Sequence, residues 1–315
     1  MSYKHQHFVS QGLLNKFSCK ESTTKTKKIY FIRINEAKAT AQCTNIRNVA
    51  GVRYLYNYTE NEKLSLEESF FEKIDNNIPI AINQVLSDIK NLEKQKFHII
   101  NYVASQIIRT PETLQKIKDL DSLIKDNIDK DLSLIKDTTV QNNFLETIKA
   151  NTEKYIKILL EKECELYEHP NNFFVISDSP VIMINSSDEQ ELDFSEKKYI
   201  PVLNYPIFMM PISPKHLIIF YNKSTSREEL NYYIARINRM QFTKANDFVF
   251  SSEKSFLEKG LNSMHIDNYH YIKSIKPQEI TQRNLKIGDE IKILKPKIVL
   301  EKNVIDSIKK NLNLK

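Results

Sequence analysis

The sequence has little glycine and little cysteine, and both shortages exclude common kinds of site. Only 4 glycines occur among 315 residues, and no two of them are close together. The P-loop and the G-x-G-x-x-G turn both need several glycines where the backbone approaches a phosphate, so neither is present. The cysteines, Cys19, Cys43 and Cys164, are far apart in the sequence and form no Cys-x-x-Cys pair. This spacing excludes a zinc ribbon and a thioredoxin motif.

Long apolar runs are also missing. No stretch reaches the roughly 18 apolar residues that a membrane helix needs. The first residues include His5, His7 and Gln11 and contain no apolar signal core. An odd and sparse cysteine count suits a reducing compartment. We therefore expect a cytoplasmic protein without a membrane partner.

Charge is plentiful but mixed in sign. The chain has 46 Lys and Arg against 40 Asp and Glu, a net charge of +6. Most of the basic residues are lysines that alternate with acidic residues along predicted helices, which is typical of a solvated face. The charge alone does not establish nucleic-acid binding, and nucleotides or nucleic acids are therefore candidate partners only.

The pattern along the chain predicts an α+β fold, with a helical middle region packed beside a mixed or antiparallel sheet. We expect a single α+β domain over residues 1–252 and a C-terminal extension over residues 253–315 that contains a helix and a hairpin. Within the domain, the order is a β-rich start (1–60), a helical region (64–168), and a region of sheet and helix (172–252).

Individual elements follow from periodicity and capping signals. Ser65 and Glu68 fit a capping box that starts a helix running to about Ile89, which Pro79 should kink or divide. Thr110 and Pro111 should start another helix. The other expected helices are 93–109, 141–167, 227–244 and a short one at 304–312. The expected strands are 29–34, 173–176, 181–184, 207–210, 217–221 and 248–251, with a tail hairpin of 291–294 and 297–300.

The segment from Phe97 to Arg109 is the most informative part of the sequence. Apart from the titratable His98, its only charged residue is Arg109. A surface helix would instead carry Lys and Glu on one face. At helical spacing, its polar side chains gather opposite its isoleucines and valine. We therefore expect a helix that is buried on both sides and carries a polar stripe. The stripe consists of His98, Tyr102, Ser105, Gln106 and Arg109.

A buried Arg109 needs a carboxylate or an anionic ligand, because an unpaired buried charge costs several kcal/mol. Asp178 is the candidate partner, since it stands alone between two apolar strands. The sequence therefore predicts that Gln106, Arg109 and Asp178 come together, with Arg109 and Asp178 in hydrogen-bonding reach or lining one cavity. A plain internal ion pair for Arg109, and an Asx-turn before Pro180 for Asp178, are the structural alternatives.

The N-terminal segment supplies further candidates. The run from His7 to Phe17 holds too many apolar side chains for a free arm, so it should pack onto the domain and bring His7 toward Gln106 and Arg109. A catalytic His7 should be reachable by solvent. His5 and His7 would share one side of a strand, which is metal-ligand spacing, but no partner cluster accompanies them. Glu68 is a candidate acid, although the capping box already explains it.

Several blocks, in order, resemble an uncharacterised and largely bacterial family, domain-of-unknown-function family 4238. The run His7 to Gln11 resembles its His-Tyr-Val-Pro-Gln opening. The run Gln106 to Pro111 is similar to its Gln-x-x-Arg-Thr-Pro element, and the run Ser177 to Val181 to its Ser-Asp-Asn-Pro-Val element. Glu68, seven residues before Asp75, resembles its paired acidic helix positions. The resemblance covers roughly residues 4–252 and implies positions without a mechanism, because the family carries no known activity.

Two functions fit these residues. In the first, the chain is a hydrolase, such as a nuclease, that acts on a phosphate-bearing substrate. His7 would be the general acid or base, Asp178 and Glu68 would position water or metal, and Arg109 would hold the phosphate. Gln106 and Tyr102 would orient the substrate. In the second, the same pocket belongs to a non-catalytic module that binds an anion, a nucleotide or a protein. The sequence leaves the cofactor unknown and indicates no metal site.

Overall fold

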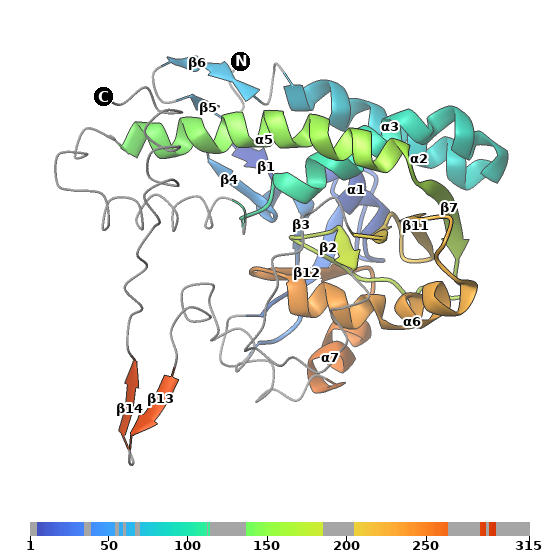
Figure 1. Ribbon diagram of the computed structural model, residues 1–315. Coiled ribbons are helices and arrows are strands. Elements are labelled where there is room, and N and C mark those ends of the chain that lie inside the picture. The colour runs from blue at the N-terminus through green and yellow to red at the C-terminus, as the bar shows by residue number, and fades with distance from the viewer. Residues whose placement is uncertain are drawn as a thin grey trace.

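A computed structural model of the chain shows antiparallel sheets between two layers of helices (Figure 1). This arrangement confirms the predicted α+β class, with a helical region beside an antiparallel sheet. The structure describes residues 5–34, 39–53, 57–58, 61–66, 70–111, 113, 137–184, 205–263, 284–287 and 290–293.

Two four-stranded antiparallel sheets form the centre of the molecule. The first has the strand order β7-β11-β10-β9 and the second the order β3-β2-β12-β8. The strands of the first sheet are β7 (Glu163–Glu168), β9 (Ile182–Ile184), β10 (Ile207–Pro211) and β11 (His216–Tyr221). Those of the second are β2 (Lys28–Arg33), β3 (Gln42–Asn45), β8 (Ile176–Ser177) and β12 (Phe248–Ser251).

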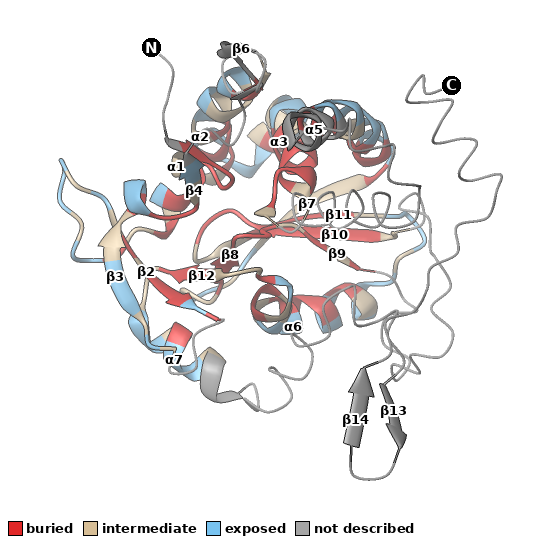
Figure 2. Cartoon of the chain, turned by 90° about the vertical axis from the view of Figure 1, so that its left-hand side faces the viewer, coloured by how far each residue is buried: buried red, intermediate tan, exposed pale blue. Residues whose placement is uncertain are grey.

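The central strands are buried on both faces. Along β10, Phe208 and Met210 belong to one hydrophobic cluster, whereas Ile207 and Met209 belong to another. This division follows from the strand period of two, which sends successive side chains to opposite faces. A sheet buried in this way needs helices on each side, and Figure 2 shows buried residues along the inner strands of the layer between them, whereas the edge strands β3 and β7 are more exposed.

The helices divide between these two faces (Figure 2). α2, α3 and α5 pack together on one side, and α6 and α7 lie on the other. Pro79 lies inside α2 without dividing it, so of the two expected effects, a kink or a division, the division does not occur. The helices are α2 (Glu72–Ser87), α3 (Leu92–Ile108), α5 (Asp137–Leu160), α6 (Arg227–Lys244) and α7 (Lys254–Ser263), with a 3-10 turn η4 (Ile89–Asn91) between α2 and α3.

The N-terminal segment packs onto the domain, as predicted. Val9, Leu13, Leu14 and Phe17 have no exposed surface. β1 (His5–His7) pairs with β4 (Gly51–Arg53), and the remaining short elements are α1 (Gln11–Leu14), η1 (Asn15–Phe17), η2 (Ile46–Asn48), β5 (Asn57–Tyr58), β6 (Asn61–Ser65), β13 (Asn284–Ile287) and β14 (Glu290–Ile293).

The predicted helix of 141–167 extends too far along the chain. Residues 163–168 form β7 rather than the end of a helix, because they pair with β11 along their whole length. Ser65 ends β6 and Leu66 directly after it is helical, whereas Glu68 lies outside the described residues, so the capping box stays a prediction. In the tail, residues 290–293 pair with 284–287, and the expected partner strand 297–300 lies outside the described residues. The predicted helix at 304–312 and most of the helix after Thr110 lie outside the described residues. Among the helices of the described residues, none has both the length and the apolar character needed to cross a membrane.

Candidate functional site

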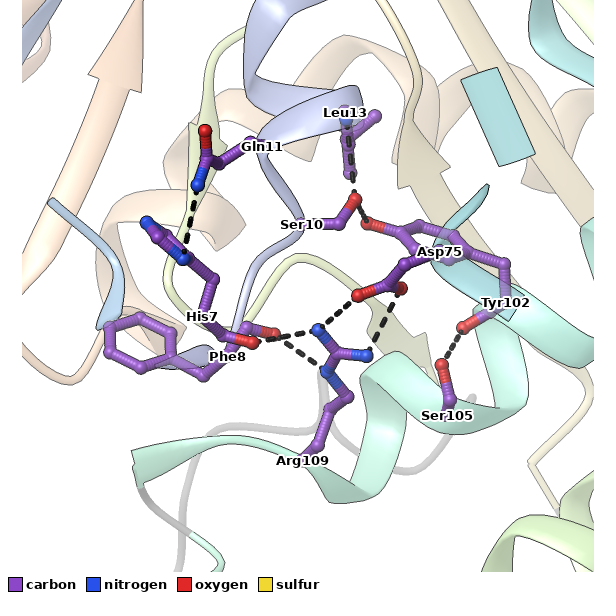
Figure 3. A network of polar contacts seen from close by, with 9 residues as sticks. All are labelled: His7, Phe8, Ser10, Gln11, Leu13, Asp75, Tyr102, Ser105 and Arg109. Atoms are coloured by element: carbon purple, nitrogen blue, oxygen red, sulfur yellow. Dashed lines mark hydrogen bonds and ion pairs between the residues drawn. The ribbon is translucent and has the colours of Figure 1, made fainter. Parts of the chain in front are cut away.

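Arg109 is the centre of a polar network that joins four segments of the chain (Figure 3). The residue follows the last turn of α3 and has no exposed surface. Its Nε donates to the carbonyl of Phe8 at 3.2 Å, and its Nη2 donates to the carbonyl of His7 at 2.7 Å. The guanidinium also lies 4.4 Å from the centroid of the Phe71 ring. The end of α3 is therefore tied to the N-terminal segment by one side chain.

The carboxylate that neutralises Arg109 is Asp75 of α2. Nη1 and Nη2 of Arg109 lie 3.1 and 2.9 Å from the two carboxylate oxygens, which is the bidentate geometry that suits a guanidinium best. The Asp75 side chain keeps 17% of its surface exposed, in contrast to its partner. Burial raises the pKa of Asp75, and the charge of Arg109 opposes that rise.

The direct pair that we predicted between Arg109 and Asp178 is wrong. The Asp178 carboxylate instead accepts three backbone hydrogen bonds, from Asn246 and Asp247 at 2.6 Å and from Phe248 at 2.9 Å. These donors lead into β12, so Asp178 fixes the start of that strand against β8. Because the donors are distant in sequence, the Asx-turn alternative does not describe Asp178 either.

Gln106 and Tyr102 lie beside Arg109 in the polar stripe of α3, as predicted. With its oxygen turned toward Arg109, Gln106 accepts from Nε at 3.2 Å and donates to the carbonyl of Phe8 at 3.2 Å. The hydroxyl of Tyr102 lies 2.7 Å from that of Ser10, which caps α1. Burial raises the pKa of Tyr102. Both side chains are buried and hold other groups of the network in place.

His7 is brought to the Arg109 network through its carbonyl oxygen, which confirms that part of the prediction. Its ring Nδ1 lies 3.4 Å from the amide nitrogen of Gln11. The expectation that His7 is reachable by solvent is not met, because the residue exposes only 8% of its surface. Glu68 and the side chain of His5 lie outside the described residues.

Asp75 is the residue that sequence reasoning missed as a partner, although its position carries a signal. It falls between Phe71 and Ile78 on the face of α2 that also buries Ile82. Residues three and four apart share a helix face, so a carboxylate there points into the core. A carboxylate inside an apolar stripe predicts a buried cation nearby, and this cation is Arg109.

A second buried polar cluster surrounds Ser177. The Gln241 side-chain oxygen accepts from the backbone nitrogen of Ser177 at 2.9 Å and from its hydroxyl at 2.7 Å. The Gln241 amide nitrogen donates to the carbonyl of Pro180 at 2.8 Å. These bonds join α6 to the loop after β8, and they account for the block of polar residues around Asp178 as a structural connection.

Chemically, the Arg109 network offers one partly exposed carboxylate held by a buried cation. Asp75 supplies the carboxylate, and a rise in its pKa moves a carboxyl group toward the range useful for acid–base chemistry. The two sequence blocks that carry the resemblance, at the N-terminus and at the end of α3, meet here (Figure 3). We take this network as the candidate functional site.

Comparison with known proteins places the chain in one family. No curated protein and no solved structure matches it. The family of proteins of unknown function DUF4238 matches over residues 5–255, which span the N-terminal segment, both four-stranded sheets and the helices α2, α3, α5 and α6. The chain therefore belongs to this family.

Proposed function

We propose that the Arg109 network is the acid–base centre of a hydrolase that acts on a phosphate-bearing substrate. The observation that carries this proposal is the state of Asp75. Its carboxylate is partly exposed, is fixed in a bidentate pair and has a pKa raised by burial. Perturbed carboxyl groups with a specific charged partner are enriched at functional sites.

In this proposal Asp75 is the general base. It removes a proton from water as the water oxygen attacks phosphorus, the bond from phosphorus to the ester oxygen breaks, and that oxygen takes a proton from solvent. His7 exposes only 8% of its surface and is not given the role of general acid. Arg109 is a positioning residue, because its cation is committed to Asp75 and to two backbone carbonyls. Gln106 and Tyr102 hold Arg109 and Ser10 instead of touching the substrate.

The charge of the whole chain supports the substrate class without establishing it. A net charge of +6 attracts phosphate-bearing molecules over long range. Arg109 cannot supply a contact to the phosphate while it is bidentate with Asp75. The proposal therefore assigns the phosphate contact to lysines outside the network. Asp178 no longer has the role of positioning water or metal, because its carboxylate accepts hydrogen bonds from three backbone nitrogens.

A non-catalytic binding module is the second candidate, and one observation favours it. The charges of Arg109 and Asp178 are both engaged inside the fold, and neither residue has exposed surface. Networks of this kind also occur as plain structural connections. In that case the Arg109 network would hold the N-terminal segment, and ligands would bind elsewhere on the surface.

The experiment compares two matched carboxylate substitutions. Hydrolysis of nucleoside phosphates, single-stranded oligonucleotides and a chromogenic phosphodiester is measured with and without Mg²⁺ or Mn²⁺. Asp75→Asn keeps the size and much of the hydrogen bonding but removes the base, so turnover should fall at least about 100-fold. Asp178→Asn makes the same change at the structural carboxylate and should retain turnover per folded molecule.

Each result selects one function. Equal loss of turnover in the two folded variants would contradict a base role for Asp75. A wild-type protein whose melting temperature rises with these ligands, but which converts none of them, would establish the binding module. A protein that neither binds nor converts them would exclude both candidates for phosphate-bearing ligands.

A further inference from the structure

Three metal-ligand side chains gather at the surface beside β2 and β3, and the Arg109 network uses none of them. They are Cys19, Glu21 and Cys43, and their ligand atoms all lie within 4.8 Å of one another. Cys19 is buried, with 4% of its surface exposed, whereas Glu21 and Cys43 are exposed. An ion could therefore reach these ligand atoms from solvent while resting against the protein.

The backbone fixes the positions of the two cysteines. Cys19 follows η1, and its nitrogen donates to the carbonyl of Lys28 at 2.9 Å, next to the start of β2. Cys43 lies on β3, directly opposite Tyr30 in the pairing with β2. The turn at Ser22 is closed by bonds in both directions between its hydroxyl and Lys28. Pairing of β2 with β3 thus brings together cysteines that are distant in the sequence.

The sulfur separation matches that of a tetrahedral metal site. Two thiolates bound at about 2.3 Å to one tetrahedral ion lie about 3.8 Å apart. The Sγ atoms of Cys19 and Cys43 are 3.8 Å apart. This separation lets one ion bind both sulfurs without rebuilding the backbone, and the exposed Glu21 side chain can complete a third contact by rotation.

We propose that Cys19, Cys43 and Glu21 form a Zn²⁺ site, with water as the fourth ligand. Thiolate ligands select thiophilic ions such as Zn²⁺ over Mg²⁺ or Ca²⁺. Two sulfurs and one carboxylate give a three-residue set that leaves one tetrahedral position open. The site has no residue in common with the proposed hydrolase centre, so the two proposals stand or fall separately.

Tyr30 is a positioning residue for this site. Its hydroxyl donates to Glu21 Oε1, as outer partners of metal-binding carboxylates commonly do.

The test uses Co²⁺ as a spectroscopic probe, followed by Zn²⁺, on the full chain kept reduced with a phosphine. We expect one Co²⁺ per chain, with the visible bands of tetrahedral cobalt and thiolate-to-metal charge transfer, and displacement of Co²⁺ by Zn²⁺. Cys43→Ser, on an exposed strand position, should abolish the charge-transfer band. Glu21→Gln should weaken Zn²⁺ binding by about tenfold or more.

Cys164→Ser is the matched control, because Cys164 lies on β7 and outside the cluster. It should bind Co²⁺ as the wild type does. Cys19→Ser removes a buried thiol and is compared with the wild type only after its fold has been verified by circular dichroism. Three results would overturn the proposal. Co²⁺ could bind without a thiolate-to-metal charge-transfer band, or Co²⁺ binding could survive Cys43→Ser. Alternatively, the chain could take up no metal and lose the mass of two hydrogens, which would indicate a Cys19–Cys43 disulfide.

Discussion

Arg109 carries a full positive charge into a position with no exposed surface. Such a charge is tolerated only when it is paired and its hydrogen-bond donors are used. Here Asp75 supplies the pair, and the carbonyls of His7 and Phe8 accept further bonds. The cation therefore does two things at once: it neutralises a carboxylate of α2 and fixes the path of the N-terminal segment.

Arg109→Ala should reduce the free energy of unfolding by about 3–5 kcal/mol, because it leaves the Asp75 carboxylate and two backbone carbonyls without their donor. Urea unfolding followed by circular dichroism measures this loss. Arg227→Ala is the matched control, since Arg227 pairs with Glu165 at 2.7 Å but is 54% exposed. The control should lose less than about 1 kcal/mol. A similarly small loss for Arg109→Ala would show that the buried pair contributes little.

The identity of the Arg109 partner shows where sequence reasoning succeeded and failed. The polar stripe of α3 predicted that Arg109 is buried, and it is. Isolation among apolar residues then indicated Asp178. Asp75 stands close to Glu72 and Lys73 in a charged stretch and was not considered as the partner. Isolation in sequence indicates burial but not which element lies opposite. That depends on how α2 packs against α3, which no local pattern contains.

At the scale of elements, α1 crosses α2 at a glycine. A Cβ atom on Gly12 would lie 2.5 Å from Cγ of Pro79, closer than non-bonded carbons approach. Gly12 therefore allows α1 to sit directly on the proline in α2. The contact also gives Pro79 a role in packing, although proline removes a hydrogen bond from a helix interior.

Gly12→Ala should lower the free energy of unfolding by about 1–3 kcal/mol, because the new methyl group overpacks this crossing. In a Pro79→Ala background the ring carbon is gone, so Gly12→Ala should lower the free energy of unfolding by less. A double-mutant cycle measured by thermal unfolding gives the coupling between the two sites. Equal losses in both backgrounds would mean that the crossing relaxes without contacting residue 79.

The elements themselves were predictable to different degrees. α6 matches its predicted range of 227–244, because Ser226 caps its first turn and its buried residues recur at helical spacing. β7 was assigned to a helix, since the short run from Glu163 to Glu168 follows a long helical pattern without a break. Its strand conformation comes from pairing with β11, a contact between segments about 50 residues apart.

At the scale of the whole molecule, His216 makes stability depend on pH. Its Nδ1 lies 2.8 Å from the hydroxyl of Ser213 beside the turn that joins β10 to β11. Burial lowers the pKa of His216 from its usual 6.5, and Glu168 opposes that shift. Below about pH 6.5 the unfolded chain therefore binds a proton that the folded chain binds less readily.

We expect the free energy of unfolding to fall as the pH drops from 6.5 toward the lowered pKa of His216. His216→Gln should flatten this part of the profile, and urea unfolding at a series of pH values measures it. His98→Gln, which removes an exposed imidazole from α3, controls for the loss of a histidine in general. The same slope in His216→Gln as in wild type would show that other groups cause the dependence.

The pairing of β2 with β12 has a consequence during synthesis of the chain. β2 is complete at Arg33, but its neighbour begins at Phe248. At ribosomal speeds of about 5–20 residues per second, roughly 10–40 s pass before that neighbour emerges. During this time β2 lacks β12, its final neighbour. The side chains affected are Ile29, Phe31 and Ile32, each of which has 7% or less of its surface exposed in the folded protein. The nascent chain should therefore be a strong client for chaperones that shield apolar strands.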